Sequence, residues 1–372
     1  MTFAIITHVP HILEQNHYFA YGPYVREMNI WSKFVDKLLI VAPSSNAKKS
    51  PIDICYKHVD IDFVAIESFD ILNPKAVLKT MLCIPKVSWK IFLTMKKADH
   101  IHLRCPGNIG LIGCLIQIFF PNKPKTAKYA GNWDLKSRQP MSYRLQKWIL
   151  SSTFLTRNMQ VLVYGEWEKS SKNIKPFFTA TYNESDKSPI IPKDLKSQVC
   201  FVFVGALVSG KNPLYAVQMI EMLFSKGYNV TLELFGEGAE RKILEDYISK
   251  NHLDNIVFLR GNQTQEVVTQ AFENSHFTML PSESEGWPKA IAEGMFWGCV
   301  PVATKVSCVP FMLDYGSRGV LLEFNLLDDV QQIEVLLHEK IRYNMMSQKA
   351  SDWSRKYTMD FFETEIKKLV SR

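Results

Sequence analysis

Buried-strand patterns and helical patterns alternate strictly through the second half of the sequence, and this feature limits the fold most. Residues 199–204 form a continuous apolar run that ends at Gly205, as expected for a strand covered on both faces. Further strands are predicted at 230–235, 255–259, 276–280 and 299–303, with helical spacing of apolar residues between them. Short connections between such units favour a parallel sheet with right-handed crossovers.

The first half alternates as well, although less regularly. Strands are predicted at residues 3–7, 37–42, 63–66, 100–103, 126–130 and 161–164. A polar segment at 183–193 is broken by two prolines and is the predicted linker. The expected fold is α/β, with two doubly wound domains, residues 1–190 and residues 191–350, that face each other across a cleft. A C-terminal helix at 351–372 could cross back to the first domain, and ligands are expected at the carboxyl ends of the strands.

The charge of the chain is unevenly distributed. Residues 1–195 contain 26 Lys or Arg and 15 Asp or Glu, a net charge of +11, whereas the remainder carries −4. A basic half indicates an anionic partner, such as nucleic acid, anionic lipid or a phosphate-bearing substrate, or else a lysine-rich surface that only maintains solubility. Six lysines interleave with large apolar residues at 75–97, which suits either a surface lying on anionic headgroups or a core helix with a solvated face.

Composition and cysteine usage restrict the class of protein. Hydrophobic residues make up 47% of the chain, which excludes disorder for most of it. The seven cysteines include no C-x-x-C pair, and an odd number does not suit a disulfide framework, so a reducing cytoplasm is the simplest interpretation. The start lacks the basic and apolar regions of a signal peptide, and the longest apolar run, 109–120, is shorter than the about 20 residues of a membrane span. The expectation is a soluble or peripheral protein.

The strongest chemical signal is the sequence S-E-S-E-G-W-P-K-A-I-A-E-G after the predicted fourth strand of the second half. Pro288 opens a helix there, and the free N–H groups of a helix start can hold a phosphate. Glu285 and Glu293 are about two helical turns apart, so both carboxylates can bind the hydroxyls of one elongated ligand. The plainer interpretation is a helix start with solvated glutamates.

Glycine-containing loops follow the other strands of the same predicted sheet. Gly205 to Lys211 follows the first strand, Gly236-Glu237-Gly238 the second, and Arg260 to Gln263 the third. Each loop alone is ordinary turn chemistry. Their joint placement at one edge of a sheet favours a ligand site.

Residues 201 to about 323 resemble the nucleotide-sugar domain of glycosyltransferase family 4, the group 1 retaining enzymes of the GT-B fold. The matching pieces are F-V-G-x-L-V-x-x-K, L-F-G-E-G-x-E-R, F-L-R-G, L-P-S-x-S-E-G-W-P and G-C-V-P-V-A-T. Glu285 and Glu293 form the family's E-x7-E motif. The resemblance implies two Rossmann-like domains, with the acceptor bound by 1–190 and the nucleotide sugar by 191–350.

The resemblance also implies roles for individual residues. Glu293 would bind the ribose hydroxyls, Glu285 the donor sugar, and Lys211 the diphosphate. The remaining donor-binding candidates are Gly22, Gly205, Gly236, Glu237, Arg260, Asn262, Gly286, Trp287, Pro288, Lys289 and Ala290. The family needs no metal and no cofactor besides the donor, a UDP- or GDP-sugar.

Two departures from the family pattern affect the site. Ala206 stands where the family usually carries an arginine, which places more weight on Lys211, with Lys289 as a helper. Residues 130–134 read A-G-N-W-D, without the histidine that many members carry near the reacting sugar. That role is empty or has passed to Asn132, Asp134 or His102, and Asn132 and Asp134 join Glu285 and Lys211 as catalytic candidates.

Other polar residues of the first half are candidates for the acceptor side. His8 and His11 flank Pro10 in the first loop. Arg104 ends a predicted strand, where it either meets a phosphate or forms a structural ion pair. His100 and His102 share one face of that strand, but no third ligand is evident, so no metal site is expected.

The sequence therefore indicates a retaining hexosyltransferase that extends a glycan or lipid-linked glycan in cell-surface polysaccharide biosynthesis. It would act in the cytoplasm, with the inner face of the cell membrane as a candidate peripheral location. The alternative is a non-catalytic GT-B protein that binds a nucleotide sugar or a polyanion, which the two departures favour and the glutamate pair opposes. A nucleic-acid binder is weaker because no recognition motif is present.

Overall fold

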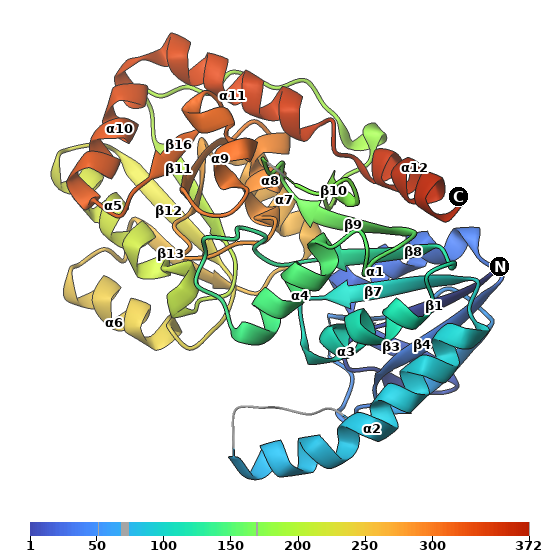
Figure 1. The fold of residues 1–372 in the computed structure, drawn as a ribbon. Helices are drawn as coiled ribbons and strands as arrows, with labels where there is room; N and C mark the ends of the chain where they lie inside the picture. The colour runs from blue at the N-terminus through green and yellow to red at the C-terminus, as the bar shows by residue number, and fades with distance from the viewer. Residues whose placement is uncertain (51, 68–73, 169, 372) are drawn as a thin grey trace. The chain divides into compact units, whose positions relative to one another are not determined.

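The computed structural model describes residues 1–50, 52–67, 74–168 and 170–371, and leaves out the side chains of 74–82. The chain forms two compact units. The first contains Met1–Phe177 and Phe362–Arg372, and the second contains Phe178–Phe361. Each unit is an α/β domain built on its own parallel sheet (Figure 1). The predicted fold class, two doubly wound Rossmann-like domains, is confirmed.

The first unit contains a seven-stranded sheet in which every adjacent pair is parallel. In spatial order its strands are β10 (Ile174–Phe177), β9 (Met159–Tyr164), β8 (Lys125–Tyr129), β7 (His100–Cys105), β1 (Thr2–Ile6), β4 (Lys37–Pro43) and β6 (Ile61–Ile66). The six predicted strands are all present. The seventh, β10, was not predicted because its sequence is only I-K-P-F. The strand order reverses between β1 and β7, which creates a topological switch point at the carboxyl edge.

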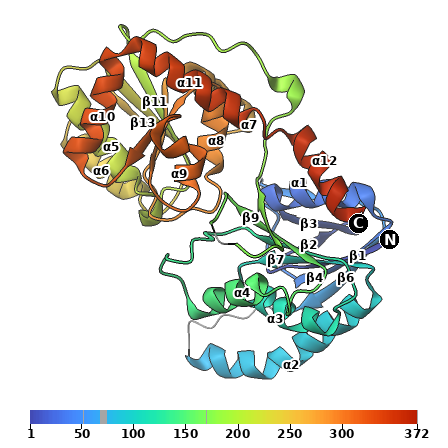
Figure 2. The same cartoon turned by 45° about the horizontal axis from the view of Figure 1, so that its top comes forward.

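Helices cover both faces of this sheet. Figure 2 shows α1 (Gly22–Trp31) and α12 (Met359–Val370) over one face, and α2 (Pro74–Lys97), α3 (Asn108–Ile116) and α4 (Met141–Ser151) over the other. The second face is closed by aliphatic side chains that include Ala4, Val41, Leu103, Val87 and Ile91. The longest apolar run of the sequence, at 109–120, is thus part of a core helix and of the short 3-10 helix η2 (Gln117–Phe119) that follows it. No helix among the described residues combines the length and apolar character required to cross a bilayer.

A small antiparallel sheet lies outside this framework and was not predicted. It consists of β2 (Ile12–Glu14), β3 (His17–Tyr21) and β5 (Asp53–Cys55). Gln15 and Asn16 both have positive φ, so they form the tight turn that joins β2 to β3. Strands β2 and β5 have only three residues each, too few to show a pattern in the sequence.

The second unit contains a six-stranded sheet, again parallel throughout. Its strands in order are β13 (Val257–Gly261), β12 (Val230–Phe235), β11 (Val199–Val204), β14 (Phe277–Leu280), β15 (Val300–Thr304) and β16 (Val320–Leu322). All five predicted strands are present, and β16 was missed because it has only three residues. The order reverses between β11 and β14, so the switch point lies beside the loops that follow these two strands.

The helices of this unit are α5 (Pro213–Ser225), α6 (Arg241–Lys250), α7 (Gln265–Asn274), α8 (Lys289–Phe296), α9 (Val309–Met312), α10 (Leu326–His338) and α11 (Lys340–Ser354). The first four alternate with the strands as predicted, whereas α9 and α10 were not predicted. Gly294 allows α8 to approach the sheet closely, because a Cβ at that position would lie 2.6 Å from the side chain of Thr278 on β14. This contact sets the depth of the helix that carries Glu293.

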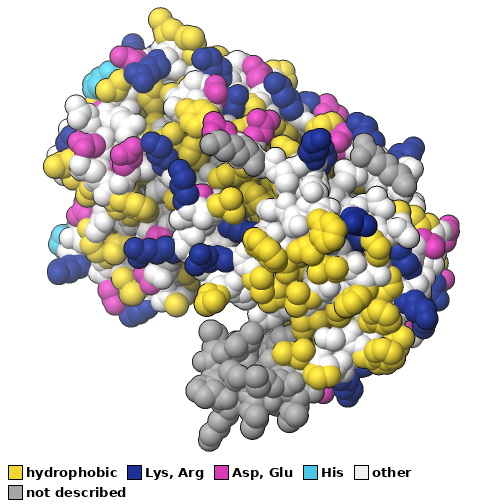
Figure 3. Space-filling model, viewed as in Figure 1, with side chains coloured by type: hydrophobic (Ala, Val, Ile, Leu, Met, Phe, Trp, Pro, Cys, Tyr) yellow, Lys and Arg dark blue, Asp and Glu magenta, His cyan; other side chains and the backbone are white. Residues whose placement is uncertain are grey.

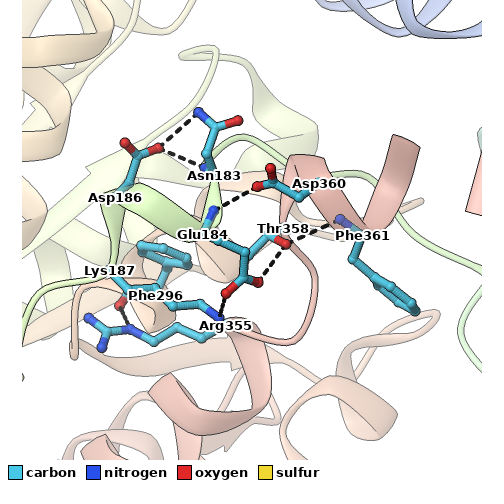
Figure 4. A network of polar contacts seen from close by, with 9 residues as sticks. All are labelled: Asn183, Glu184, Asp186, Lys187, Phe296, Arg355, Thr358, Asp360 and Phe361. Carbon is cyan, nitrogen blue, oxygen red and sulfur yellow. Dashed lines mark hydrogen bonds and ion pairs between the residues drawn. The ribbon is translucent and has the colours of Figure 1, made fainter. Parts of the chain in front are cut away.

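The segment predicted as a linker is attached to the second unit. The 3-10 helix η3 (Glu184–Asp186) is closed by a capping box in which Asn183 and Asp186 bond reciprocally. Figure 4 shows that Thr358 donates a hydrogen bond to Glu184 and that the Glu184 N–H donates to Asp360, at 2.9 and 2.7 Å. The border between the units accordingly lies at Phe177 and Phe178, ahead of the predicted limit at residue 190.

The last helix returns the chain to the first unit. Phe362 of α12 packs on Phe177 with ring centroids 5.5 Å apart, whereas Phe178 packs on Phe361 within the second unit. Lys33 and Glu363 add an ion pair of 2.5 Å. Residues Phe362–Arg372 therefore belong to the first unit, and those from residue 351 to Phe361 to the second.

Candidate functional site

The loops after β11 and β12 interlock at the carboxyl edge of the six-stranded sheet. A Cβ on Gly236, which has φ +149°, would lie 1.9 Å from the Gly205 carbonyl oxygen. A Cβ on Gly238 would lie 2.2 Å from the Leu207 carbonyl, and the Leu207 N–H donates to the Glu237 carbonyl at 3.0 Å. The glycines are therefore required because two backbones meet. This contact fixes the loop that leads to Lys211.

The end of β13 and the loop that follows it present Arg260 and Asn262 at the surface. Arg260 pairs with Glu233 at 2.6 Å, and Glu237 pairs with Arg241 at 2.6 Å. Arg260 also lines a pocket of about 360 Å³ together with Glu233, Phe235, Gln263, Val267, Gln270, Ala271 and Asn274. Arg260, one of the predicted donor-binding residues, thus borders a hollow on the surface.

Lys211 and Glu285 lie together at the switch point. Lys211 ends the 3-10 helix η4 (Ser209–Lys211) after β11, and Glu285 lies between β14 and α8. The Lys211 Nζ is 2.5 Å from Oε1 of Glu285, whose side chain is 7% exposed. The Glu283 N–H donates to the Gly210 carbonyl at 2.9 Å, which ties the two loops together. The structure therefore joins two residues that the sequence analysis assigned to one donor.

Glu293 lies on α8, eight residues after Glu285 in the chain. Its Oε1 accepts a hydrogen bond of 2.6 Å from the Thr181 hydroxyl and lies 3.5 Å from the Lys289 Nζ. The predicted helper Lys289 is thus paired with Glu293. Thr181 was not predicted, and it could not have been, because it precedes η3 in an irregular segment. The side chain of Glu293 is mostly buried, which limits the directions in which it can meet a ligand.

The start of α8 is held by packing around Trp287. The helix begins at Lys289, and Pro288 is its N-cap without a side-chain cap, so the first-turn amide of Ala290 is part of an uncapped helix start. Trp287 packs on Trp353 and Tyr357, with centroid distances of 5.9 and 5.6 Å.

The loop before α8 is also tied to α9. The Gly286 carbonyl accepts a hydrogen bond from the Cys308 thiol at 2.9 Å. Burial and the neighbouring Glu285 raise the pKa of Cys308, which keeps it a neutral thiol. Cys308 therefore serves as a donor to the loop and has no nucleophilic character.

In the first unit, Gly22 and His8 lie near the switch point of the seven-stranded sheet. Gly22 donates to the Ile52 carbonyl at 3.0 Å, and a Cβ there would lie 2.4 Å from the same oxygen. His8 is exposed and faces Gly107, where a Cβ would lie 3.0 Å from the His8 Nδ1. Glycine at these positions lets two loops approach the edge of the sheet.

Arg104 takes part in a buried ion-pair cluster. Glu27 on α1 accepts from Arg104 at 2.7 Å and from Lys128 at 2.9 Å, and all three side chains are buried. Burial lowers the pKa of Lys128 to about 8. Burial opposes ionisation of Glu27, but the two cations overcome it and hold the pKa of Glu27 below its ordinary value. Of the two interpretations of Arg104, the structure shows the ion pair.

His11 and His102 are interior residues. His11 donates through Nδ1 to the Val9 carbonyl at 2.8 Å and accepts from the Tyr56 hydroxyl at 2.9 Å, and burial lowers its pKa to about 4. His102 lies between the sheet and α1 with its Nδ1 2.8 Å from the Thr126 hydroxyl, and burial likewise lowers its pKa. Both rings are therefore neutral core groups with no exposed surface for an acceptor.

Asn132 and Asp134 lie in a loop that is organised by its own side chains. Asn132 Oδ1 accepts from the Asp134 N–H at 2.8 Å, and Asp134 Oδ1 accepts from the Lys136 N–H at 2.8 Å. Both residues are half-buried. Across the parts of the chain that the structure describes, no group of three or more His, Cys, Asp or Glu side chains could hold a metal.

Residues 186–353 match the family model of glycosyl transferases group 1. This region contains Lys211, Glu285 and Glu293. The match thus covers the part of the second unit in which the candidate donor site lies.

Three curated relatives share sequence with the chain. An uncharacterized glycosyltransferase of Methanocaldococcus jannaschii is 27% identical over 43% of this chain and 44% of its own length. Protein CapJ of Staphylococcus aureus is 22% identical over 74% of this chain and 72% of its own. The poly(glycerol-phosphate) alpha-glucosyltransferase of Bacillus subtilis is 24% identical over 49% of this chain and 27% of its own length. The chain thus spans less than half the length of two of these relatives.

Solved structures share the fold over the whole chain. Anabaena HepE in complex with UDP and glucose superposes with a TM-score of 0.69 at 14% identity, covering 100% of this chain and 99% of HepE. Sucrose-phosphate synthase of Thermosynechococcus elongatus superposes with a TM-score of 0.66 at 14% identity, covering 99% of this chain and 98% of the synthase. The two-domain architecture is thus that of GT-B proteins, and residues 186–353 of this chain are similar in sequence to the glycosyl transferases group 1.

Proposed function

We propose that the protein is a retaining hexosyltransferase that uses a nucleotide-diphosphate sugar. The observation that carries the proposal is the placement of Lys211, Glu285 and Glu293 around the start of α8. One cation and two carboxylates, separated along one helix start, can bind a diphosphate, a sugar and a ribose. Family 4 membership, a hexose as the transferred sugar and retention of configuration are parts of this proposal.

In this scheme the second unit activates the leaving group. Charge develops on the diphosphate as the glycosidic bond breaks, and Lys211 with the uncapped amides of α8 would stabilise it. The diphosphate could then accept the proton of the acceptor hydroxyl on the same face of the sugar. Glu285 would orient the sugar hydroxyls, Glu293 the ribose, and Asn132 or Asp134 would approach the reacting sugar from the acceptor side. With Lys211 supplying the positive charge, we propose that transfer needs no metal and no cofactor besides the donor.

The names of related proteins support this chemistry at a coarser level. One curated relative is an alpha-glucosyltransferase, and HepE was solved with UDP and glucose. Other relatives are named for capsular polysaccharide and colanic acid biosynthesis. We therefore propose a UDP-sugar as the first donor to test, a GDP-sugar as the second, and a glycan or lipid-linked glycan of the cell surface as acceptor.

We further propose a cytoplasmic location. The structure describes all seven cysteines and joins none of them in a disulfide, which fits a reducing compartment. The carbohydrate acceptor would therefore be extended on the inner side of the cell membrane.

The test measures nucleoside diphosphate release with and without a glycan acceptor. A donor panel is first screened by thermal unfolding, where a ligand at 100 times its dissociation constant adds about 2.7 kcal/mol of stability. Release of the diphosphate that depends on the acceptor, with an α-linked product by NMR from an α-linked donor, supports a retaining transferase. Tight binding of the nucleotide sugar without any transfer would identify the non-catalytic alternative.

A further inference from the structure

Large apolar side chains are exposed on the outer side of α2, α3 and α4 in the first unit. Trp89 and Trp148 are 61% and 64% exposed, and Phe119 is 72% exposed. We call this surface the apolar face and define it by Trp89, Leu93, Leu115, Phe119, Leu145 and Trp148. The helices α2 and α4 both pack against α3, so the three lie side by side. Figure 3 shows hydrophobic side chains gathered over this part of the unit.

These residues are not needed by the core of the unit. On α2, Val87, Ile91 and Met95 point toward the sheet, whereas Trp89 and Leu93 lie on the opposite side. On α4, Ile149 and Leu150 are buried, whereas Leu145 and Trp148 are exposed one turn apart. Each helix is therefore apolar on two sides, of which only one is covered within the unit. An exposed apolar patch that crosses several elements is typical of an interaction surface.

The charged residues on the helices that carry the apolar face are all basic. The sequences of α2, α3, η2 and α4 contain no Asp or Glu. Between residues 71 and 165 the acidic residues of the sequence are Asp99 and Asp134. Exposed basic residues border the face at Lys86, Lys96, Lys97, Arg144 and Arg157. Ile91, one of the apolar residues that interleave with lysines in the sequence, is in fact buried, and the side chains of 74–82 lie outside the described residues.

The combination selects the occupant of the face. A second copy of this chain would bring two basic borders together around a two-fold axis, which is unfavourable. Tryptophan rings and lysine stems are instead suited to a bilayer interface, where apolar parts enter the headgroup region and ammonium groups meet lipid phosphates. The sign of the border requires an anionic lipid.

We propose that the apolar face is a docking surface for an anionic lipid bilayer, with Trp89 and Trp148 at the depth of the headgroups. This attachment is independent of the donor site, so it holds or fails separately from the proposed transferase activity. It would hold the first unit, which carries the acceptor-side candidates, against a membrane that contains lipid-linked glycans.

The first experiment is cosedimentation of the full chain with vesicles of phosphatidylcholine alone or mixed with an equal part of phosphatidylglycerol. Binding is expected only to the mixed vesicles at 0.1 M salt and should be lost at 1 M, where the Debye length falls from about 10 to about 3 Å. Replacing Lys97 and Arg144 by Ser should lower the partition coefficient roughly 30-fold, because each basic residue near the surface contributes about fivefold. The matched control replaces Lys349 and Lys356, which are exposed in the second unit, and should bind like the unchanged protein.

The second experiment locates the bound face with vesicles whose lipid chains carry bromine, a quencher of tryptophan fluorescence. Of the eight tryptophans, all within the described residues, Trp89 and Trp148 are the exposed ones. The protein should be quenched on binding, and the double variant Trp89→Phe, Trp148→Phe should still bind but lose most of the quenching. Replacing both by Ser should abolish binding, whereas Ile341→Ser, an exposed apolar residue of the second unit, should not.

Three outcomes would overturn the proposal. Equal binding to neutral vesicles would remove the role of the basic border. Quenching that persists in the Phe variant would place the bound surface elsewhere. Concentration-dependent dimerisation that the Ser variant abolishes, without any vesicle binding, would assign the face to a second copy of the chain.

Discussion

The Nζ of Lys211 lies 2.5 Å from Oε1 of Glu285, although 74 residues separate them in the chain. The pair joins the loop after β11 to the loop before α8, on the two sides of the switch point. A donor diphosphate that takes up Lys211 would release this carboxylate oxygen to accept a hydrogen bond from a sugar hydroxyl. Binding of the phosphate and orientation of the sugar are therefore coupled through one contact.

Lys211→Ala should reduce transfer more than donor affinity. The lysine would stabilise a leaving group that gains charge in the transition state, so its loss is expected to cost at least about 1.5–3 kcal/mol, mostly in kcat. Steady-state kinetics measures this. Lys289→Ala is the matched control, since Lys289 pairs with Glu293 at 3.5 Å, and it should change kcat little. Near-normal turnover in Lys211→Ala, with a large loss in Lys289→Ala, would transfer the role to Lys289.

The two glutamates should differ in what they control. Glu293→Gln should weaken the binding of UDP or GDP, because the neutral amide is a poorer acceptor for the ribose hydroxyls. Glu285→Gln should lower turnover without weakening nucleotide binding, because the uncharged amide competes less with the diphosphate for Lys211. Calorimetric titration with each nucleotide, beside kinetics of both variants, separates the two effects. Thr181→Val, which removes the 2.6 Å hydrogen bond to Glu293, should weaken nucleotide binding less than Glu293→Gln does. Unchanged nucleotide affinity in Glu293→Gln would contradict the assignment.

Gly236→Ala should destabilise the second unit. Its Cβ would lie 1.9 Å from the Gly205 carbonyl oxygen, and a φ of +149° is unfavourable for alanine. We expect a loss of more than about 2 kcal/mol in the free energy of unfolding, measured by denaturant titration. Gly210→Ala is the control, because a Cβ there would have no neighbour within 4 Å, and it should change stability by less than about 1 kcal/mol. Equal stability of the two variants would show that the loops can separate without cost.

Acidification should destabilise the first unit through His11. Burial lowers its pKa to about 4, compared with 6.5 when unfolded, so between these values the unfolded chain binds a proton that the folded chain does not. Stability from this group is therefore complete above pH 6.5 and falls by about 1.4 kcal/mol per pH unit down to pH 4. Denaturant titrations at several pH values across this range should show that the free energy of unfolding of His11→Gln changes less steeply with pH.

The matched control for this titration is His17→Gln. His17 is exposed, so its replacement should leave the slope unchanged. His100, whose pKa burial also lowers to about 4, should keep its own share of the slope in both variants. An identical slope in His11→Gln and the unchanged chain would show that His11 titrates normally in the folded state.

The architecture of the second unit, and the positions along the chain of its donor-site candidates, could be predicted from the amino-acid sequence. The strand Val199–Val204 is buried on both faces, so its apolar run is continuous and its bounds are visible without a structure, whereas Thr231 and Glu233 interrupt the run in Val230–Phe235. Parallel strands separated by helices place the loops at Gly205, Gly236 and Glu285 at one edge of a sheet. These features depend on local periodicity and on a chain topology that has few alternatives.

Contacts between side chains far apart in the chain could not be predicted from the sequence and are known only from the tertiary structure. Glu27 lies 77 residues from Arg104 and 101 from Lys128, and no spacing rule brings them into one cluster. The same holds for Thr181 and Glu293, and for Phe362, whose aromatic contact with Phe177 places the end of the chain in the first unit. Long-range contacts depend on strand order, on helix depth and on side-chain direction. A pattern of apolar residues records that a helix has two apolar sides, as at Trp89 and Ile91, but only packing against the sheet selects which side is covered and which remains exposed.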